Sequence, residues 1–309
     1  MRPSQLTTPV AFFIFNRPDL TKIVFEQIRS ARPLRLYVIA DGPRDNYPGD
    51  VEKCCATRSI TDVIDWPCQV IRNYAEKNLG CGLRVSTGVS WVFEQEEEAI
   101  FLEDDCVPHP SFFNFCSSLL EKYRDKQEIM HISGNNCAIR DGKSSDSYYF
   151  SLIPHCWGWA TWRRAWRYYD FQLKKLPEAL AGNELKNFWT DRKIVRYWED
   201  LFKGLYLAER KYTWDYQWTF ACLIHGGLCV TPRETLVSNI GFTPDATHTT
   251  KSNDPLAALP LQEIEFPLQH PKVIVRSQAA DDQVHKEVFR VNRVNHWLRI
   301  LKNLFPRKF

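Results

Sequence analysis

Short apolar runs alternate with helix-period segments through the first third of the chain, and this alternation restricts the fold more than any other feature. The run at 10–15 is continuously apolar, as in a strand buried on both faces, and those at 36–40, 68–71 and 99–102 have the length and pattern of further short strands. The segment at 20–28 repeats apolar residues at helical spacing. The pattern predicts an α/β fold, with a Rossmann-like mixed sheet flanked by helices.

Polar side chains stand where the predicted strands end. Arg17 follows the first run, Asp41 follows the second, and the acidic triplet Glu103, Asp104 and Asp105 follows the fourth. Ligands of open α/β sheets bind outside the carboxyl ends of the strands. Three adjacent carboxylates are costly to desolvate, so they favour a cation site there, and a solvated turn before a helix is the alternative.

A glycine-punctuated loop, 78–82, opens the helix that follows the third run. Glycine has no Cβ, so Gly80 and Gly82 allow a ligand to approach the backbone closely. Arg17 suits a diphosphate and Asp41 suits a base or ribose donor. Together these features predict a nucleotide pocket. Taken singly, Arg17 is typical of a surface cation and Asp41 of an ordinary turn.

Tryptophan is concentrated just beyond the middle of the chain. Trp162 and Trp166 are four residues apart, which predicts a shared helical face packed in the core. Gly158 lies between Trp157 and Trp159, which predicts a backbone close to a ligand and an indole platform for a sugar face.

Several helical segments are predicted in the second half. Those at about 185–200 and 201–210 favour an insertion or a lid, and Asp215 lies in the first turn of a helix at 213–224. The proline-containing stretch 251–283 is expected to wrap the surface. A basic amphipathic helix at 288–305 is expected to pack on the domain or to dock peripherally on the inner face of a membrane.

In this order the motifs resemble those of the GT-A glycosyltransferases, and within them the N-acetylglucosaminyltransferase I family and its bacterial relatives. The resemblance covers about 9–249 and rests on Phe15-Asn16-Arg17, Ala40-Asp41-Gly42, Phe101-Leu102-Glu103-Asp104-Asp105, Trp157-Gly158-Trp159 and Trp214-Asp215. It implies a GT-A domain at 1–250, with a nucleotide-binding half at 1–125 and an acceptor half at 126–250, before a C-terminal region at 251–309.

The resemblance also implies an activity. A member of this family would be an inverting transferase that uses Mn²⁺ or Mg²⁺ to move a sugar, such as N-acetylglucosamine, from a nucleotide-diphospho-sugar such as a UDP-sugar. The acceptor would be a saccharide or a lipid-linked saccharide. A sugar nucleotidyltransferase is the enzymatic alternative, although 16–20 is not the Gly-rich basic loop such enzymes carry after the first strand. The non-enzymatic alternative is a non-catalytic carbohydrate-binding or interaction protein.

Residue roles follow from the resemblance by position. Glu103 would contact the donor sugar, Asp104 the ribose and Asp105 the metal, while Arg17 and Asp41 would meet phosphate and base.

The remaining roles concern the acceptor half and two departures from the family. Asp215 would be the catalytic base, and Gly158 and Trp159 would contact the donor. The family's base-contacting histidine has no match, so Arg84 is expected to replace it. Other GT-A enzymes bring a C-terminal histidine to the metal, a role that His248 would fill.

Composition excludes some classes of function. The 40 basic and 37 acidic side chains nearly cancel, which argues against nucleic-acid binding. The 10 cysteines form no CxxC pair, so reduced thiols are expected. No window approaches the roughly 18 apolar residues of a membrane span, and the N-terminus has no apolar signal segment, so a cytoplasmic protein is expected.

Overall fold

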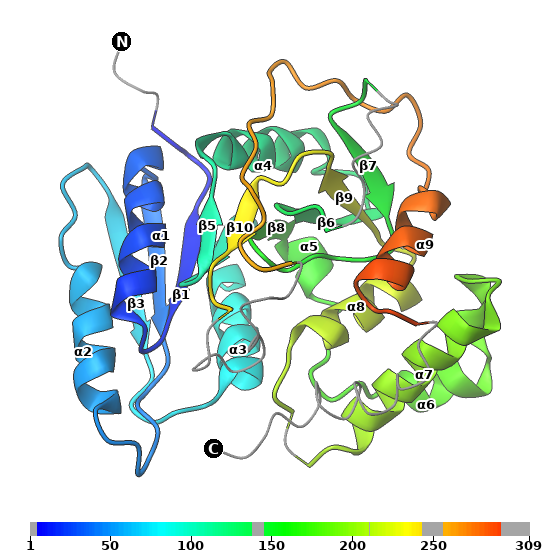
Figure 1. The fold of residues 1–309 in the computed structure, drawn as a ribbon, viewed down its shortest axis with the longest axis horizontal. Helices are drawn as coiled ribbons and strands as arrows, with labels where there is room; N and C mark the ends of the chain where they lie inside the picture. The colour runs from blue at the N-terminus through cyan, green and yellow to red at the C-terminus, as the bar shows by residue number, and fades with distance from the viewer. Residues whose placement is uncertain (1–4, 138–144, 210, 243–255, 292–309) are drawn as a thin grey trace.

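The computed structural model describes residues 5–137, 145–209, 211–242 and 256–291 (Figure 1). Its centre is an 8-stranded mixed sheet in the order β3-β2-β1-β4-β8-β6-β9-β7, flanked by helices. The predicted α/β class with a Rossmann-like mixed sheet is confirmed. The strands of this sheet are β1 (Val10–Ile14), β2 (Arg35–Ala40), β3 (Gln69–Tyr74), β4 (Glu98–Glu103), β6 (Ile129–Ser133), β7 (Tyr148–Ser151), β8 (Trp159–Trp162) and β9 (Leu228–Pro232). A separate two-stranded ribbon pairs β5 (Cys106–Pro108) with β10 (Val237–Asn239).

Helices connect the strands, and some of them cover the sheet. The helices are α1 (Pro18–Ala31), α2 (Asp50–Ile60), α3 (Cys81–Phe93), α4 (Pro110–Lys122), α5 (Arg163–Trp166), α6 (Leu176–Ala181), α7 (Arg192–Leu207), α8 (Asp215–Ile224) and α9 (Gln278–Glu287), with a 3-10 turn at Glu184–Asn187. Helices α6 and α7 do not cover the sheet but lie to one side and pack with α8 (Figure 1). None of the helices in these described ranges is long and apolar enough to cross a membrane.

The first four strands are parallel, and their order reverses beside β1. The chain passes from β1 outward to β2 and β3, then returns through α3 to place β4 on the other side of β1. Side chains of β1 are buried on both faces, as the continuous apolar run predicts. Residues after β1 and β4 therefore meet at a topological switch point, which is where sheets of this kind bind ligands.

The tryptophan-rich segment differs from its prediction. Trp162 ends strand β8, which pairs antiparallel with β4 from Glu98↔Trp162 to Phe101↔Trp159, and Trp166 closes the single turn α5. The shared helical face is wrong, because pairing along the exposed edge of β4 overrides the helical spacing. The predicted core packing of Trp162 and Trp166 is confirmed, since both are buried.

Two later expectations also need correction. The predicted break between helices at 200 is absent, because one continuous helix, α7, spans it with a buried apolar face. Residues 256–277 follow the surface as a largely irregular chain, but α9 begins inside the stretch expected to wrap, at Gln278. Most of the expected C-terminal helix at 288–305 lies outside the described residues.

A candidate active site at the ends of β1 and β4

Arg17 and the strand-end acids meet at the switch point. Arg17 forms ion pairs with both Asp104 and Asp105, the second at 2.9 Å from its Nη1 to Oδ2. The backbone N–H of Phe15 donates to Asp104 Oδ2 at 3.2 Å. The carboxylates lie deep in the site, with Asp104 only 3% and Asp105 only 8% exposed. The turn after β4 is therefore a buried, partnered charge cluster and not a solvated turn.

The cluster carries more negative charge than Arg17 neutralises. Burial, followed by repulsion from Asp105 and Asp104, raises the pKa of Glu103 to about 8. Burial also raises the pKa of Asp104 although Arg17 lies beside it. Such a cluster attracts a further cation.

Gly241 is a site residue that sequence reasoning missed. The ribbon strand β10 leads into it, and the N–H of Ile240 donates to the carbonyl of Asp105 at 2.9 Å. A Cβ on Gly241 would lie 2.0 Å from Asp105 Oδ2, so only glycine leaves room for that carboxylate. The available signal was a glycine two residues after a short strand.

Asp215 approaches the same cluster from the second half of the chain. It is the first residue of α8, and it interacts electrostatically with Glu103. Gly82 permits this approach, since a Cβ there would lie 2.7 Å from the carbonyl oxygen of Lys211 and 2.8 Å from that of Thr213. The glycine loop thus packs against the backbone that leads to Asp215, a contact that its sequence did not predict.

Asp41 and Arg84 lie at the same sheet edge, but their polar groups bind the protein itself. Asp41 accepts from the N–H groups of Gly42, Leu79 and Gly80 at 2.8–2.9 Å. Burial nevertheless raises its pKa. Arg84 donates to the carbonyls of Ala40 and Asn73. Both residues hold the glycine loop and β3 together, and the structure gives no independent support for contact with a base.

Trp159 and Gly158 pack against residues of β4, β10 and the start of α8. The Trp159 ring is 2% exposed and stacks on Phe101 at 4.5 Å and Trp214 at 5.1 Å between centroids. Gly158 has a positive φ of 63° and packs closely against Val237. Protein side chains cover the Trp159 ring and Val237 lies against Gly158, so both residues have a packing role here. Their predicted contact with a donor stays a prediction.

The residues that the structure describes are compatible with a divalent cation held jointly with a ligand. Within the described ranges, no three His, Cys, Asp or Glu side chains are grouped to hold a metal on their own. Mg²⁺-like ions are usually bound by one or two carboxylates together with substrate phosphates. The incompletely neutralised cluster of Glu103, Asp104 and Asp105 suits that arrangement. His248, the other predicted ligand, lies outside the described residues.

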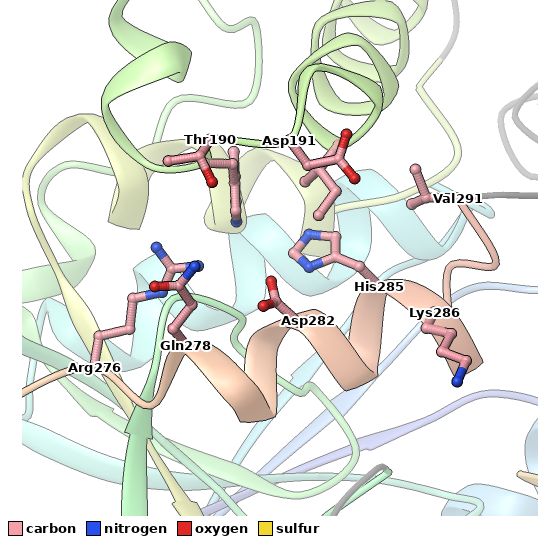
Figure 2. Close-up of a pocket in the computed structure, with 10 residues that line it drawn as sticks. Thr190, Asp191, Arg276, Gln278, Asp282, His285, Lys286 and Val291 are labelled. Atoms are coloured by element: carbon pink, nitrogen blue, oxygen red, sulfur yellow. The ribbon is translucent and has the colours of Figure 1, made fainter.

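A pocket of about 230 Å³ lies elsewhere, between the start of α7 and α9. Figure 2 shows Asp191 on one side and Arg276, Asp282, His285 and Lys286 on the other. His285 is fixed in this wall, because its Nε2 accepts from the indole N–H of Trp198 at 2.9 Å. No strand-end acid lines this pocket, so it is distinct from the candidate active site.

Comparisons with known proteins add little to this geometry. No family model and no curated protein matches the chain. A solved structure titled "The Crystal Structure of UDP-glucose pyrophosphorylase complexed with UDP-glucose" matches 48% of this chain and 62% of its own, with 13% identity and a TM-score of 0.27. The chain therefore matches less than two thirds of that structure's length, and a similarity this low assigns no function.

Proposed function

We propose that the protein is a metal-dependent inverting glycosyltransferase. It would transfer a sugar from a nucleotide-diphospho-sugar to a hydroxyl group of a glycan or a lipid-linked saccharide. The observation that carries the proposal is the buried acidic cluster at the switch point, with Arg17 paired to it and Asp215 of α8 adding to the repulsion that raises the pKa of Glu103.

Each side of the site has a separate task in this proposal. When bound, a divalent cation held by Asp105 would supply positive charge to the leaving diphosphate. Arg17 keeps Asp104 and Asp105 in place and adds its own charge for the same phosphates. Glu103 and Asp104 offer oxygen atoms for hydroxyl groups of the donor sugar and ribose.

The chemistry requires one proton acceptor. The acceptor hydroxyl oxygen forms a bond to the anomeric carbon, the bond from that carbon to the diphosphate oxygen breaks, and Asp215 takes the hydroxyl proton. The nucleoside diphosphate leaves with the bonding electrons. Inversion requires Asp215 to act on the face of the anomeric carbon opposite the leaving diphosphate, and this placement is part of the proposal.

Asp215→Asn tests the base. Asparagine keeps the shape of the side chain but cannot take the proton, so transfer should fall about 10²–10⁴-fold while donor binding stays unchanged. Product formation with UDP-, GDP-, CMP- and dTDP-sugars, together with donor calorimetry, measures both quantities. Asp125→Asn is the matched control, since it makes the same change at an exposed carboxylate. Near-normal transfer by Asp215→Asn, or a product that retains the donor's anomeric configuration, would reject the proposed mechanism.

Asp105→Asn tests the cation. Nucleoside diphosphate should bind the wild type only with Mn²⁺ or Mg²⁺ present, and the variant should bind weakly under either condition. Equal binding in the presence of chelator would contradict the proposal. A parallel assay with nucleoside triphosphate and sugar 1-phosphate identifies the rival activity, because pyrophosphate release there would indicate a nucleotidyltransferase.

A further inference from the structure

A second pocket, of about 190 Å³, lies between 167–175 and α8. Phe220 and Ile224 of α8 supply apolar lining, and Arg167, Lys175 and His225 supply basic groups. Neither the sequence motifs nor the proposed transfer reaction uses these basic side chains.

The charges in this pocket are unbalanced. Within the described ranges, neither Arg167 nor Lys175 has an ion-pair partner, and both are exposed. Asp170 also lines the pocket, but its two oxygens accept the N–H groups of Gln172 at 3.0 Å and Lys174 at 2.5 Å. The carboxylate is held by its own turn but keeps its charge, so Arg167 and Lys175 against Asp170 leave a surplus of one positive charge.

One aromatic ring orders two of the basic groups. Tyr168 stacks on His225 with ring centroids 4.0 Å apart and an interplanar angle of 22°. Nη2 of Arg167 donates to the Tyr168 hydroxyl at 2.6 Å, and its guanidinium carbon lies 4.7 Å from the ring centroid. Burial, with Lys175 and Arg167 nearby, lowers the pKa of His225. Arg167 is therefore held in place before any ligand arrives, which reduces the entropy cost of binding.

We propose that this pocket binds the anionic group, a phosphate or a carboxylate, of a small-molecule ligand. Arg167 and Lys175 bind the charge, since a guanidinium matches both oxyanions with paired N–H donors. Phe220 and Ile224 contact the apolar part attached to it. The strand-end acids repel a free anion, so without a cation the two sites have opposite preferences.

The pocket is also lined by α8, the helix that begins at Asp215. Tyr169, another lining residue, donates its hydroxyl to the carbonyl of Trp214 at 3.2 Å. Trp214 directly precedes Asp215, so one side chain links the basic pocket to the start of α8. The anion site nevertheless stands independently of the transferase proposal.

Calorimetry with inorganic phosphate and phenyl phosphate tests the site, in the presence of chelator so that no cation recruits phosphate to the acids. We expect phenyl phosphate to bind more tightly than phosphate, and Arg167→Gln and Lys175→Gln each to weaken binding about tenfold. Lys174→Gln is the matched control, because this neighbouring lysine does not line the pocket. Asp215→Asn should bind phenyl phosphate normally, which separates this site from the active site.

Benzoate distinguishes the two sources of negative charge. Tighter binding of benzoate than of phenyl phosphate would identify a carboxylate ligand, and the reverse would identify a phosphate ligand. Thermal melting verifies that each variant is folded. His225→Asn is a further variant of the pocket lining, and it is measured with the same anions. Absence of binding by all three anions, or binding unchanged in the Arg167→Gln/Lys175→Gln double variant, would overturn the proposal.

Discussion

At the scale of single residues, Asp50 shows how one buried carboxylate secures the loop beside the candidate active site. Its oxygens accept from Nε and Nη2 of Arg44 at 2.8 and 2.9 Å and from the amide of Asn16 at 2.7 Å. The hydrogen bond from Arg44 is the main reason that the pKa of Asp50 falls to about 2. Asn16 directly precedes Arg17, so this contact ties the loop after β2 to the loop that carries the site arginine.

The Asp50 contacts predict a pH-dependent stability. A depressed folded-state pKa means that the carboxylate stabilises the fold above its ordinary pKa of 3.8, and that this stabilisation disappears as the pH falls to about 2. Asp50→Asn should therefore lower the free energy of unfolding by about 2 kcal/mol at pH 6, and by progressively less between about pH 4 and pH 2. Urea titrations across this range measure the difference. A deficit that is the same at every pH would show that ionisation of Asp50 does not contribute.

At the scale of secondary-structure elements, the sequence predicted those helices and strands that local interactions determine, and it failed where distant residues determine the structure. The apolar run of β1 and the proline at the start of α1 carry their own signals, and both elements form where expected. Strand β8 carries no such signal, because the spacing of Trp162 and Trp166 is typical of a helix. Residues 159–162 form a strand because they pair with the edge of β4. Long-range pairing of this kind is absent from a single-sequence pattern.

Gly82 gives a prediction at the same scale, because it fixes how α3 meets the segment before α8. Gly82→Ala would place a Cβ within 2.8 Å of two backbone carbonyls, so 211–213 must shift and carry Asp215 with it. We expect a fall in transfer of at least about tenfold with donor affinity largely retained, as is typical when a catalytic group is misplaced.

Gly182→Ala is the matched control for this variant. A Cβ there meets nothing closer than 3.5 Å. Kinetics with saturating donor compare the two substitutions. Equal activity in both variants would show that contact at Gly82 does not position Asp215.

At the scale of the whole molecule, topology explains which part of the candidate site could be predicted. Arg17 and Asp105 are far apart in sequence, but both follow adjacent parallel strands, so the rule for strand ends brings them together. Gly241 is brought to Asp105 by the pairing of strands β5 and β10, and no periodicity in the sequence predicts this pairing. The acids themselves were predictable, whereas the backbone that encloses them was not.

The position of β8 has a consequence for the growing polypeptide. During synthesis β4 emerges before the strand that covers its outer edge, so residues 98–103 present unpaired backbone groups until 159–162 arrive. We expect a chain truncated at 158 to aggregate more readily than one truncated at 172, which contains β8 and α5. Sedimentation of both fragments after refolding measures this, and equal solubility would contradict it. Translation that pauses between these two strands would lengthen the interval in which the nascent chain needs a chaperone.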